Sequence, residues 1–178
     1  MSGDVQPAFD TLYLLRHGET EFNRRGLTLG SLDLPLTPTG RDQAAAAAAR
    51  LTGLPIAGFH CSPALRCRET AAFVTAVIGR EPRIVPDLAE RCWGELEGLP
   101  RALKAIRPLP PSVEALDQFN HRVRLALTAL QSHSLVVTHS GVFRSVTHWL
   151  GVSAPEGLGT GALVRFHRVP GGFQLDEC

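Results

Sequence analysis

The chain has 178 residues, of which 44% are hydrophobic and 20% are charged, and its formal net charge is +1. This length and composition are typical of one globular domain, residues 1–178, with residues 1–9 as a disordered tail. A net charge near zero gives no general attraction to nucleic acid or to an anionic membrane, and no apolar run predicts a membrane-spanning helix. The first residues resemble no signal peptide. Four scattered cysteines without a C-x-x-C pair favour reduced thiols and a cytoplasmic location.

Strands and helices alternate along the chain. Thr37 and Ser62 are each followed by proline, a pattern typical of a helix N-cap, and Ser112 is a third candidate cap. The alternation predicts an α/β fold, a three-layer α/β/α sandwich around a mainly parallel sheet. The expected elements are a strand at 10–15, a helix at 37–51, a strand at 56–61, a helix at 62–78, a short strand at 83–85, a helix at 112–130, a strand at 134–138, a helix from about 140 to 150, and a strand pair at 161–167 and 172–175.

Cations, imidazoles and a carboxylate fall where the predicted strands end. Arg16 and His17 follow the first strand, and His139 follows the fourth. Arg66 lies in the first turn of the helix after the second strand, and Glu90 follows the third. Right-handed crossovers bring the carboxyl ends of parallel strands to one edge of the sheet, where ligands bind in open α/β folds. We therefore expect these five side chains to meet, although each alone would more often be a packing or surface residue.

This combination of side chains suits a doubly charged phosphoryl group. Two arginines can neutralise the group and hold its equatorial oxygens. One imidazole can attack phosphorus while the other donates hydrogen bonds to the pentacoordinate species. The carboxylate can protonate the leaving oxygen and later deprotonate water. Such a scheme requires no metal ion and no cofactor.

Five short segments that contain these residues occur in a fixed order. They are residues 15–20 (L-R-H-G-E-T) with Asn23, residues 36–40 (L-T-P-T-G), residues 62–70 (S-P-A-L-R-C-R-E-T), residues 88–98 (L-A-E-R-C-W-G-E-L-E-G) and residues 136–141 (V-V-T-H-S-G). The ordered set resembles the signature of the histidine phosphatase superfamily, also called the phosphoglycerate mutase-like family. One R-H-G triplet would be weak evidence, whereas five segments in order are specific.

The resemblance implies a role for each residue. His17 is the nucleophile that becomes phosphorylated, and its nitrogen far from the backbone attacks while the other binds a main-chain carbonyl. Glu90 is the proton donor and later the base. The remaining residues implied to form the phosphate pocket are Arg16, Asn23, Arg66, His139 and Ser140.

Two departures from the family pattern favour hydrolysis. The G-W-x-D element of the mutase branch is replaced by residues 30–33 (G-S-L-D), which lack the Trp. The segment 99–112, expected to form a roof over the site, is short, so water can reach the pocket and a phosphatase is favoured over a mutase. The expected substrate is a small phosphorylated metabolite. The alternatives are a phosphoglycerate mutase, a phosphoprotein phosphatase that uses the same site, and a catalytically silent phosphate-binding module.

Two further features of the sequence have less specific interpretations. The final strand could pair across a homodimer. Several basic loop residues could border the pocket and bind a second anionic group, although solvated loop charge is the favoured interpretation for them: Arg24, Arg25, Arg91, Arg101, Lys104 and Arg107.

Overall fold

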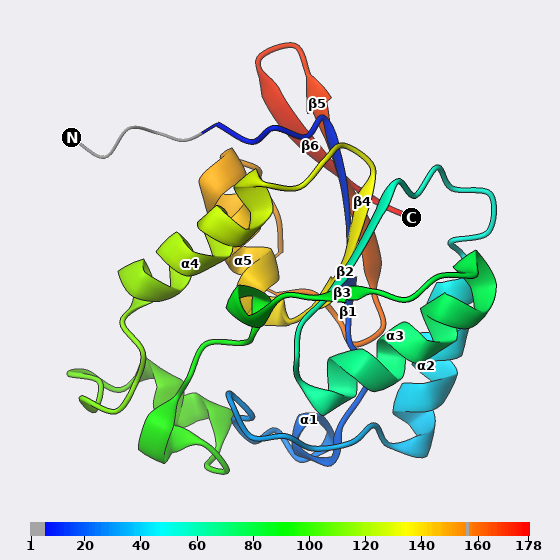
Figure 1. The fold of residues 1–178 in the computed structure, drawn as a ribbon. Coiled ribbons are helices and arrows are strands. Elements are labelled where there is room, and N and C mark those ends of the chain that lie inside the picture. Colours follow the sequence, from blue (N-terminus) through cyan, green and yellow to red (C-terminus); the bar gives the residue numbers. More distant parts are fainter. Residues whose placement is uncertain (1–5, 156) are drawn as a thin grey trace.

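The computed structural model describes residues 6–155 and 157–178, and its centre is one six-stranded sheet (Figure 1). The strands lie in the order β3-β2-β4-β1-β5-β6. The first four of these pair in parallel, whereas β5 and β6 are antiparallel to their neighbours. The predicted α/β fold is confirmed, and only the C-terminal strand pair departs from a parallel sheet. The strand bounds are Thr11–Arg16 for β1, Gly58–Cys61 for β2, Arg83–Ile84 for β3, Ser134–Thr138 for β4, Leu163–Val169 for β5 and Gly172–Glu177 for β6.

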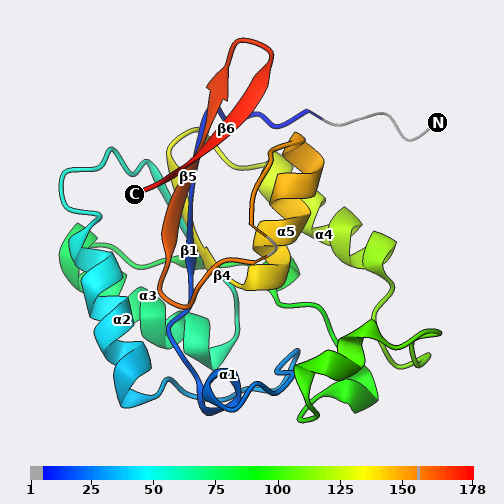
Figure 2. The same cartoon turned by 180° about the vertical axis from the view of Figure 1, so that it is seen from behind.

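Helices cover both faces of the sheet, with α2 and α3 on one side and α4 and α5 on the other (Figures 1 and 2). Among the described residues, no helix is long and apolar enough to cross a lipid bilayer. The α-helices are α1 (Glu21–Arg24), α2 (Pro38–Ala49), α3 (Leu65–Ile78), α4 (Leu116–Thr128) and α5 (Ser140–Leu150), and the 3-10 helices are η1 (Pro86–Leu88), η2 (Gly94–Leu96) and η3 (Arg101–Ala105).

The side chains of β1 alternate between two hydrophobic cores, one on each face of the sheet. Leu12 and Leu14 pack with Phe143 of α5, and Tyr13 and Leu15 pack against α2 and α3 on the opposite face. The strand is therefore held from both sides, which fixes the position of its carboxyl end. The site residues that follow β1 start from this fixed point.

The N-cap predictions have different outcomes. Thr37 caps α2 as predicted, because its Oγ1 accepts a hydrogen bond from the Gly40 N–H at 3.0 Å. Ser62 does not cap α3, which begins at Leu65 and whose first N–H is bound by Asp33 Oδ1 at 2.5 Å. The carboxylate comes from a loop 32 residues earlier, so the local sequence contains no signal for it.

The helix expected from Ser112 starts later in the chain. Helix α4 begins at Leu116, and Ser112 Oγ instead accepts a hydrogen bond from the Glu95 N–H at 3.2 Å. Ser112 therefore stabilises the preceding irregular segment. Residues 93–113, which we call the lobe, contain η2 and η3 and a small core in which Trp93, Leu96 and Val113 are buried. The lobe is the green, irregular part at the lower left of Figure 1.

The predicted disordered tail does not include Phe9. Phe9 is fully buried and packs edge-on against Trp149 and Phe173, with ring centroids 6.1 and 5.7 Å away. The prediction of a disordered tail is thus wrong at Phe9, because this aromatic side chain completes the core beside α5. Residues 1–5 lie outside the described part of the chain.

Candidate active site

His17 follows β1 directly and is almost fully buried. Its Nδ1 lies 2.7 Å from the Gly18 carbonyl oxygen. A carbonyl only accepts hydrogen bonds, so Nδ1 holds the ring proton and the lone pair of Nε2 is available. This is the arrangement that the family resemblance implies. Position 18 has to be glycine, because a Cβ there would lie 2.1 Å from the Gly40 carbonyl oxygen.

Arg66 and His139 form a buried pair beside His17. The Arg66 guanidinium donates to the carbonyl oxygens of Leu32 and Gly30 at 2.8 and 2.9 Å. Its Nη2 also lies 3.2 Å from His139 Nδ1. The rings of His139 and His17 are 5.3 Å apart, edge to face. These contacts hold a guanidinium and two imidazoles at one point, where the ends of β1 and β4 and the start of α3 meet.

Glu90 is held by two backbone N–H groups. Its Oε1 accepts from Arg91 N at 2.9 Å, and its Oε2 accepts from Gly141 N, in the first turn of α5, at 3.1 Å. A Cβ at position 141 would lie 1.9 Å from Glu90 Oε1, so the carboxylate packs directly against the backbone. The first turn of α5 therefore fixes the direction of the carboxylate.

The structure brings the predicted site residues together around one cavity of about 390 Å³. His139 lies behind its wall, in contact with Arg66. Asn23 Oδ1 accepts from the Thr20 N–H and hydroxyl, both at 3.0 Å, which leaves the amide nitrogen of Asn23 as its potential donor to a ligand. The predicted residues that line the cavity are Arg16, His17, Asn23, Arg66, Glu90 and Ser140.

Burial and neighbouring cations lower the proton affinity of this cluster. The pKa of His17 lies well below its ordinary value, because of burial and then because of Arg66 and Arg16. The pKa of His139 is also well below its ordinary value, because of burial and the Arg66 charge. Burial lowers the pKa of Arg16 to about 10 and that of Lys104 to about 8. Both imidazoles are thus neutral at pH 7. The neighbouring arginines make the electrostatic potential around them positive, and a bound oxyanion would offset this charge.

Part of the cavity wall was absent from the predicted set. Arg144 lines the cavity from α5, four residues after Ser140; this helical spacing places it on the same face and could have indicated it. Leu158 precedes β5, and its carbonyl oxygen accepts a hydrogen bond from Arg16 Nη1. Because β5 is antiparallel to β1, its start lies beside the end of β1.

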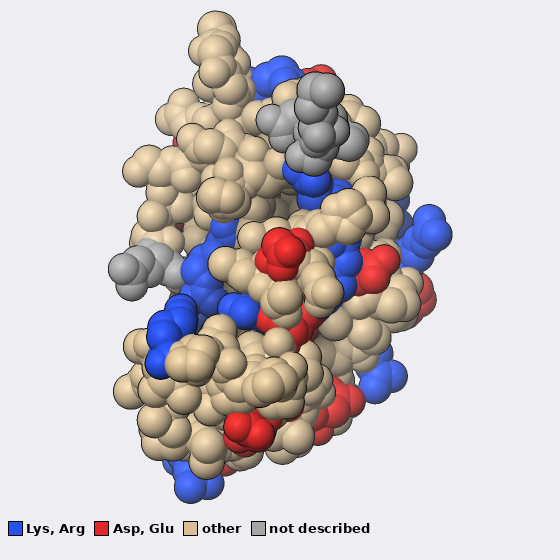
Figure 3. All heavy atoms as spheres, turned by 90° about the vertical axis from the view of Figure 1, so that its left-hand side faces the viewer, with Lys and Arg blue, Asp and Glu red and all other residues tan. Residues whose placement is uncertain are grey.

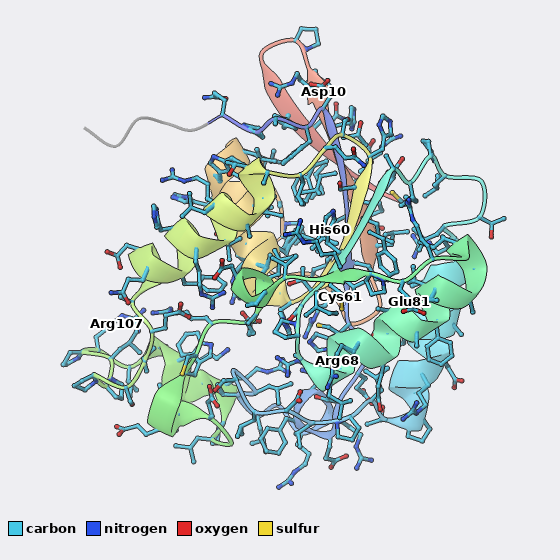
Figure 4. The ribbon with its side chains drawn as sticks, in the orientation of Figure 1. Asp10, His60, Cys61, Arg68, Glu81 and Arg107 are labelled. Atoms are coloured by element: carbon cyan, nitrogen blue, oxygen red, sulfur yellow. The ribbon has the colours of Figure 1, made fainter. Side chains whose placement is uncertain are left out.

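Five of the six basic loop residues divide into two groups, and the sixth, Arg91, lines a neighbouring cavity. Arg101 and Lys104, both in the lobe, line the cavity, whereas Arg107 lies at the outer edge of the lobe (Figure 4). Arg24 and Arg25 are exposed. On the face drawn in Figure 3, Lys and Arg side chains gather in a hollow above the lobe. Among the described residues, no three His, Cys, Asp or Glu side chains are grouped as ligands for a metal ion.

Comparison with known proteins defines the family. The model of the histidine phosphatase superfamily (branch 1) matches residues 12–177, and the chain belongs to this superfamily. A metal-independent phosphoserine phosphatase of Arabidopsis thaliana is 32% identical over 165 residues, which cover 80% of this chain and 69% of that protein. The crystal structure of a phosphoglycerate mutase from Thermus thermophilus is 34% identical, has a TM-score of 0.73, and matches over 87% of this chain and 91% of the other.

Some relatives are much longer than this chain. Agropine synthesis reductase of Rhizobium rhizogenes is 36% identical over 169 residues, which cover 88% of this chain and 39% of that protein. The chain spans 39% to 43% of the length of the first curated relatives that it matches. The relatives named above and a phosphoglycerate mutase-like protein of Arabidopsis thaliana carry phosphatase, mutase or reductase names.

Proposed function

We propose that this chain is a metal-independent phosphatase that hydrolyses small phosphate monoesters through a phosphohistidine on His17. The observation that best supports the proposal is the hydrogen bond of 2.7 Å between His17 Nδ1 and the Gly18 carbonyl oxygen. It leaves Nε2 as a nucleophile in the same cavity as Arg16, Arg66 and the Glu90 carboxylate. The cavity volume of about 390 Å³ suits a small substrate.

The first step forms a bond between Nε2 and phosphorus and breaks the bond between phosphorus and the ester oxygen. Arg16 and Arg66 stabilise the charge on the equatorial oxygens. Protonated Glu90 gives its proton to the departing alcohol oxygen, so that the alcohol leaves uncharged. In the second step, the Glu90 carboxylate takes a proton from water, the water oxygen attacks phosphorus, and inorganic phosphate leaves His17.

Phosphate release from a panel of monoesters tests this scheme. We expect steady release without a bisphosphate activator, and a ³²P label on the protein that is stable in base and labile in acid. Glu90→Gln should lower kcat by about 10²–10⁴-fold, as is typical of lost acid–base catalysis. His17→Ala is the blank and should take up no label.

The alternatives give different results in the same experiment. Transfer of the phosphoryl group between substrates without phosphate release would indicate a mutase. Turnover of a phosphopeptide in preference to every small ester would indicate a phosphoprotein phosphatase. Phosphate binding without turnover of any ester would indicate a silent binding module.

A further inference from the structure

The cavity of about 390 Å³ beside His17 is called the phosphate cavity below. A second cavity of about 400 Å³ adjoins it. The two cavities share Lys104 and Arg144 as walls. Gly141, whose N–H holds the Glu90 carboxylate at 3.1 Å, lines the second cavity. The second cavity is therefore next to the group that would protonate the leaving oxygen.

The walls of this second cavity combine apolar and cationic groups. Trp93 is 6% exposed, and Phe119 is 2% exposed, so both are rigid surfaces, whereas Leu116 at the start of α4 is 56% exposed. Two cations pack on the indole ring: Arg91 Cζ lies 4.6 Å and Lys104 Nζ 4.2 Å from the ring centroid. The Trp93 ring therefore holds two cations at the rim of an apolar space.

The cations near the two cavities exceed what one phosphate requires. Arg16 and Arg66 are sufficient to balance a phosphate dianion. Arg101 and Lys104 also line the phosphate cavity, where Glu90 is the one carboxylate among the described lining residues. Within residues 6–155 and 157–178, no salt bridge to a carboxylate involves Arg91, Arg101 or Lys104. This local excess of positive charge favours a ligand with a further negative group.

If Glu90 protonates the departing oxygen, the leaving group lies on the side of the phosphate cavity that adjoins the second cavity. An in-line displacement puts the departing oxygen opposite His17 Nε2. A proton donor has to lie within hydrogen-bond distance of that oxygen, and the backbone that holds the Glu90 carboxylate also lines the second cavity. A leaving group larger than a few atoms would thus extend past Glu90 toward Trp93 and Lys104.

We propose that the substrates of this site are phosphomonoesters whose alcohol part bears a second anionic group, bound by Lys104 and Arg91, and an apolar or aryl portion, packed against Trp93 and Leu116. This inference rests on the proposed phosphatase function and specifies its substrate class. The leaving group, and not the phosphoryl group, determines which esters are hydrolysed.

A matched pair of esters tests the anionic part. Phenyl phosphate with a meta-carboxylate and its meta-carboxamide analogue differ mainly in charge. We expect the wild-type enzyme to favour the carboxylate by about tenfold or more in kcat/KM, as for a hydrogen bond to a charged group in a half-buried site. Lys104→Met should bring this ratio close to one.

The control is a cation outside both cavities. Arg68, in α3, is exposed and lines a separate hollow with Glu81; both residues are labelled in Figure 4. Arg68→Met removes the same charge and should keep the wild-type ratio. Equal hydrolysis of both esters by the wild-type enzyme, or an unchanged ratio in Lys104→Met, would overturn this inference alone. Failure to release phosphate from either ester would overturn the proposed function as well.

A second ratio tests the apolar part. The carboxyphenyl ester and phosphoglycolate both bear a carboxylate, but only the first has a ring. Leu116→Asn should lower kcat/KM for the aryl ester relative to phosphoglycolate by about fourfold, the effect of losing roughly one buried methylene contact. Because Leu116 is 56% exposed, this substitution should leave the core intact. An unchanged ratio would show that the ring does not pack against α4.

Discussion

The two adjoining cavities form one pocket, with His17 at its phosphate end and the lobe at its other end. These two ends are built in different ways. At the phosphate end, His17, Arg66 and His139 are all buried, and they follow or face strands that lie in the middle of the sheet. At the other end, Arg101 is exposed and Lys104 half-buried, and both belong to the irregular lobe. The lobe core has three buried side chains, far fewer than either core beside the sheet.

This difference in burial separates the residues that act on phosphorus from the residues that we expect to select the substrate. Buried groups with several hydrogen bonds each keep one geometry, which in-line attack on phosphorus requires. Groups on a small lobe tolerate substitution and movement, because little packing depends on them. The phosphate end therefore fixes the type of reaction, and the lobe is where we expect substrate preference to be set.

The largest expected effect comes from one chemical change made at both ends. Arg66→Lys keeps the charge but loses the planar fork that binds Leu32 O and Gly30 O and faces the phosphate cavity. We expect kcat/KM to fall by about 10²–10³-fold, the range for a lost transition-state donor. Arg101→Lys, in the exposed lobe, should lower kcat/KM by about threefold at most.

Steady-state kinetics on one ester, with the unfolding temperature of each variant as a folding control, compare the two ends directly. Similar losses in Arg66→Lys and Arg101→Lys would mean that the lobe takes part in the chemistry. In that case, it would be wrong to assign the reaction to the phosphate end and substrate preference to the lobe.

A smaller loss is expected at the boundary between the two ends. Gly141→Ala places a Cβ only 1.9 Å from the present position of Glu90 Oε1, so the carboxylate has to move. We expect kcat to fall by about 10²-fold, because a displaced acid loses much of its catalytic effect. The measurement is kcat for Gly141→Ala, Glu90→Gln and the double variant.

The double variant isolates the cause. If Gly141 acts through Glu90, adding Gly141→Ala to Glu90→Gln should cost little further activity, whereas independent effects would multiply. Multiplied effects would show that residue 141 contributes to the lobe side of the pocket in its own right.

The same division separates what the sequence could predict from what it could not. Arg16, His17, Arg66 and His139 could be placed because the ends of buried parallel strands converge on one edge, whatever their side chains. The cap of α2 could be predicted because Thr37 and Gly40 are neighbours in the sequence. These signals are local or follow from the topology alone.

The missed features depend on contacts between distant segments. Asp33 binds the first N–H of α3 from another loop, and Ser112 stabilises the lobe instead of starting α4. The cavity between Trp93 and α4 exists only because the lobe packs beside α4. No periodicity or spacing in the sequence encodes such packing between irregular segments.

The smallest expected effect is on the stability of the folded protein, and the two buried histidines of the phosphate end contribute to it. His17 and His139 have pKa values well below the ordinary one in the folded protein, while in the unfolded chain each titrates near pH 6.5. Their neutral forms therefore contribute full stability above about pH 6.5. Below it the unfolded chain binds more protons, so the free energy of unfolding should fall by up to about 1.4 kcal/mol per pH unit for each histidine.

Urea unfolding at several pH values between about 5 and 8 measures this slope. Below about pH 6.5, His17→Gln should make this slope shallower by one proton. Lys104→Met should leave the slope there unchanged, because Lys104, with a pKa of about 8, stays protonated at that pH. Saturating inorganic phosphate should also reduce the slope, because a bound anion offsets the field of Arg66 and Arg16, which adds to burial in keeping the imidazoles neutral. A slope equal in wild type and His17→Gln would mean that the phosphate end is more hydrated than its burial indicates. The phosphate end and the lobe would then no longer differ in how far their side chains are shielded from water.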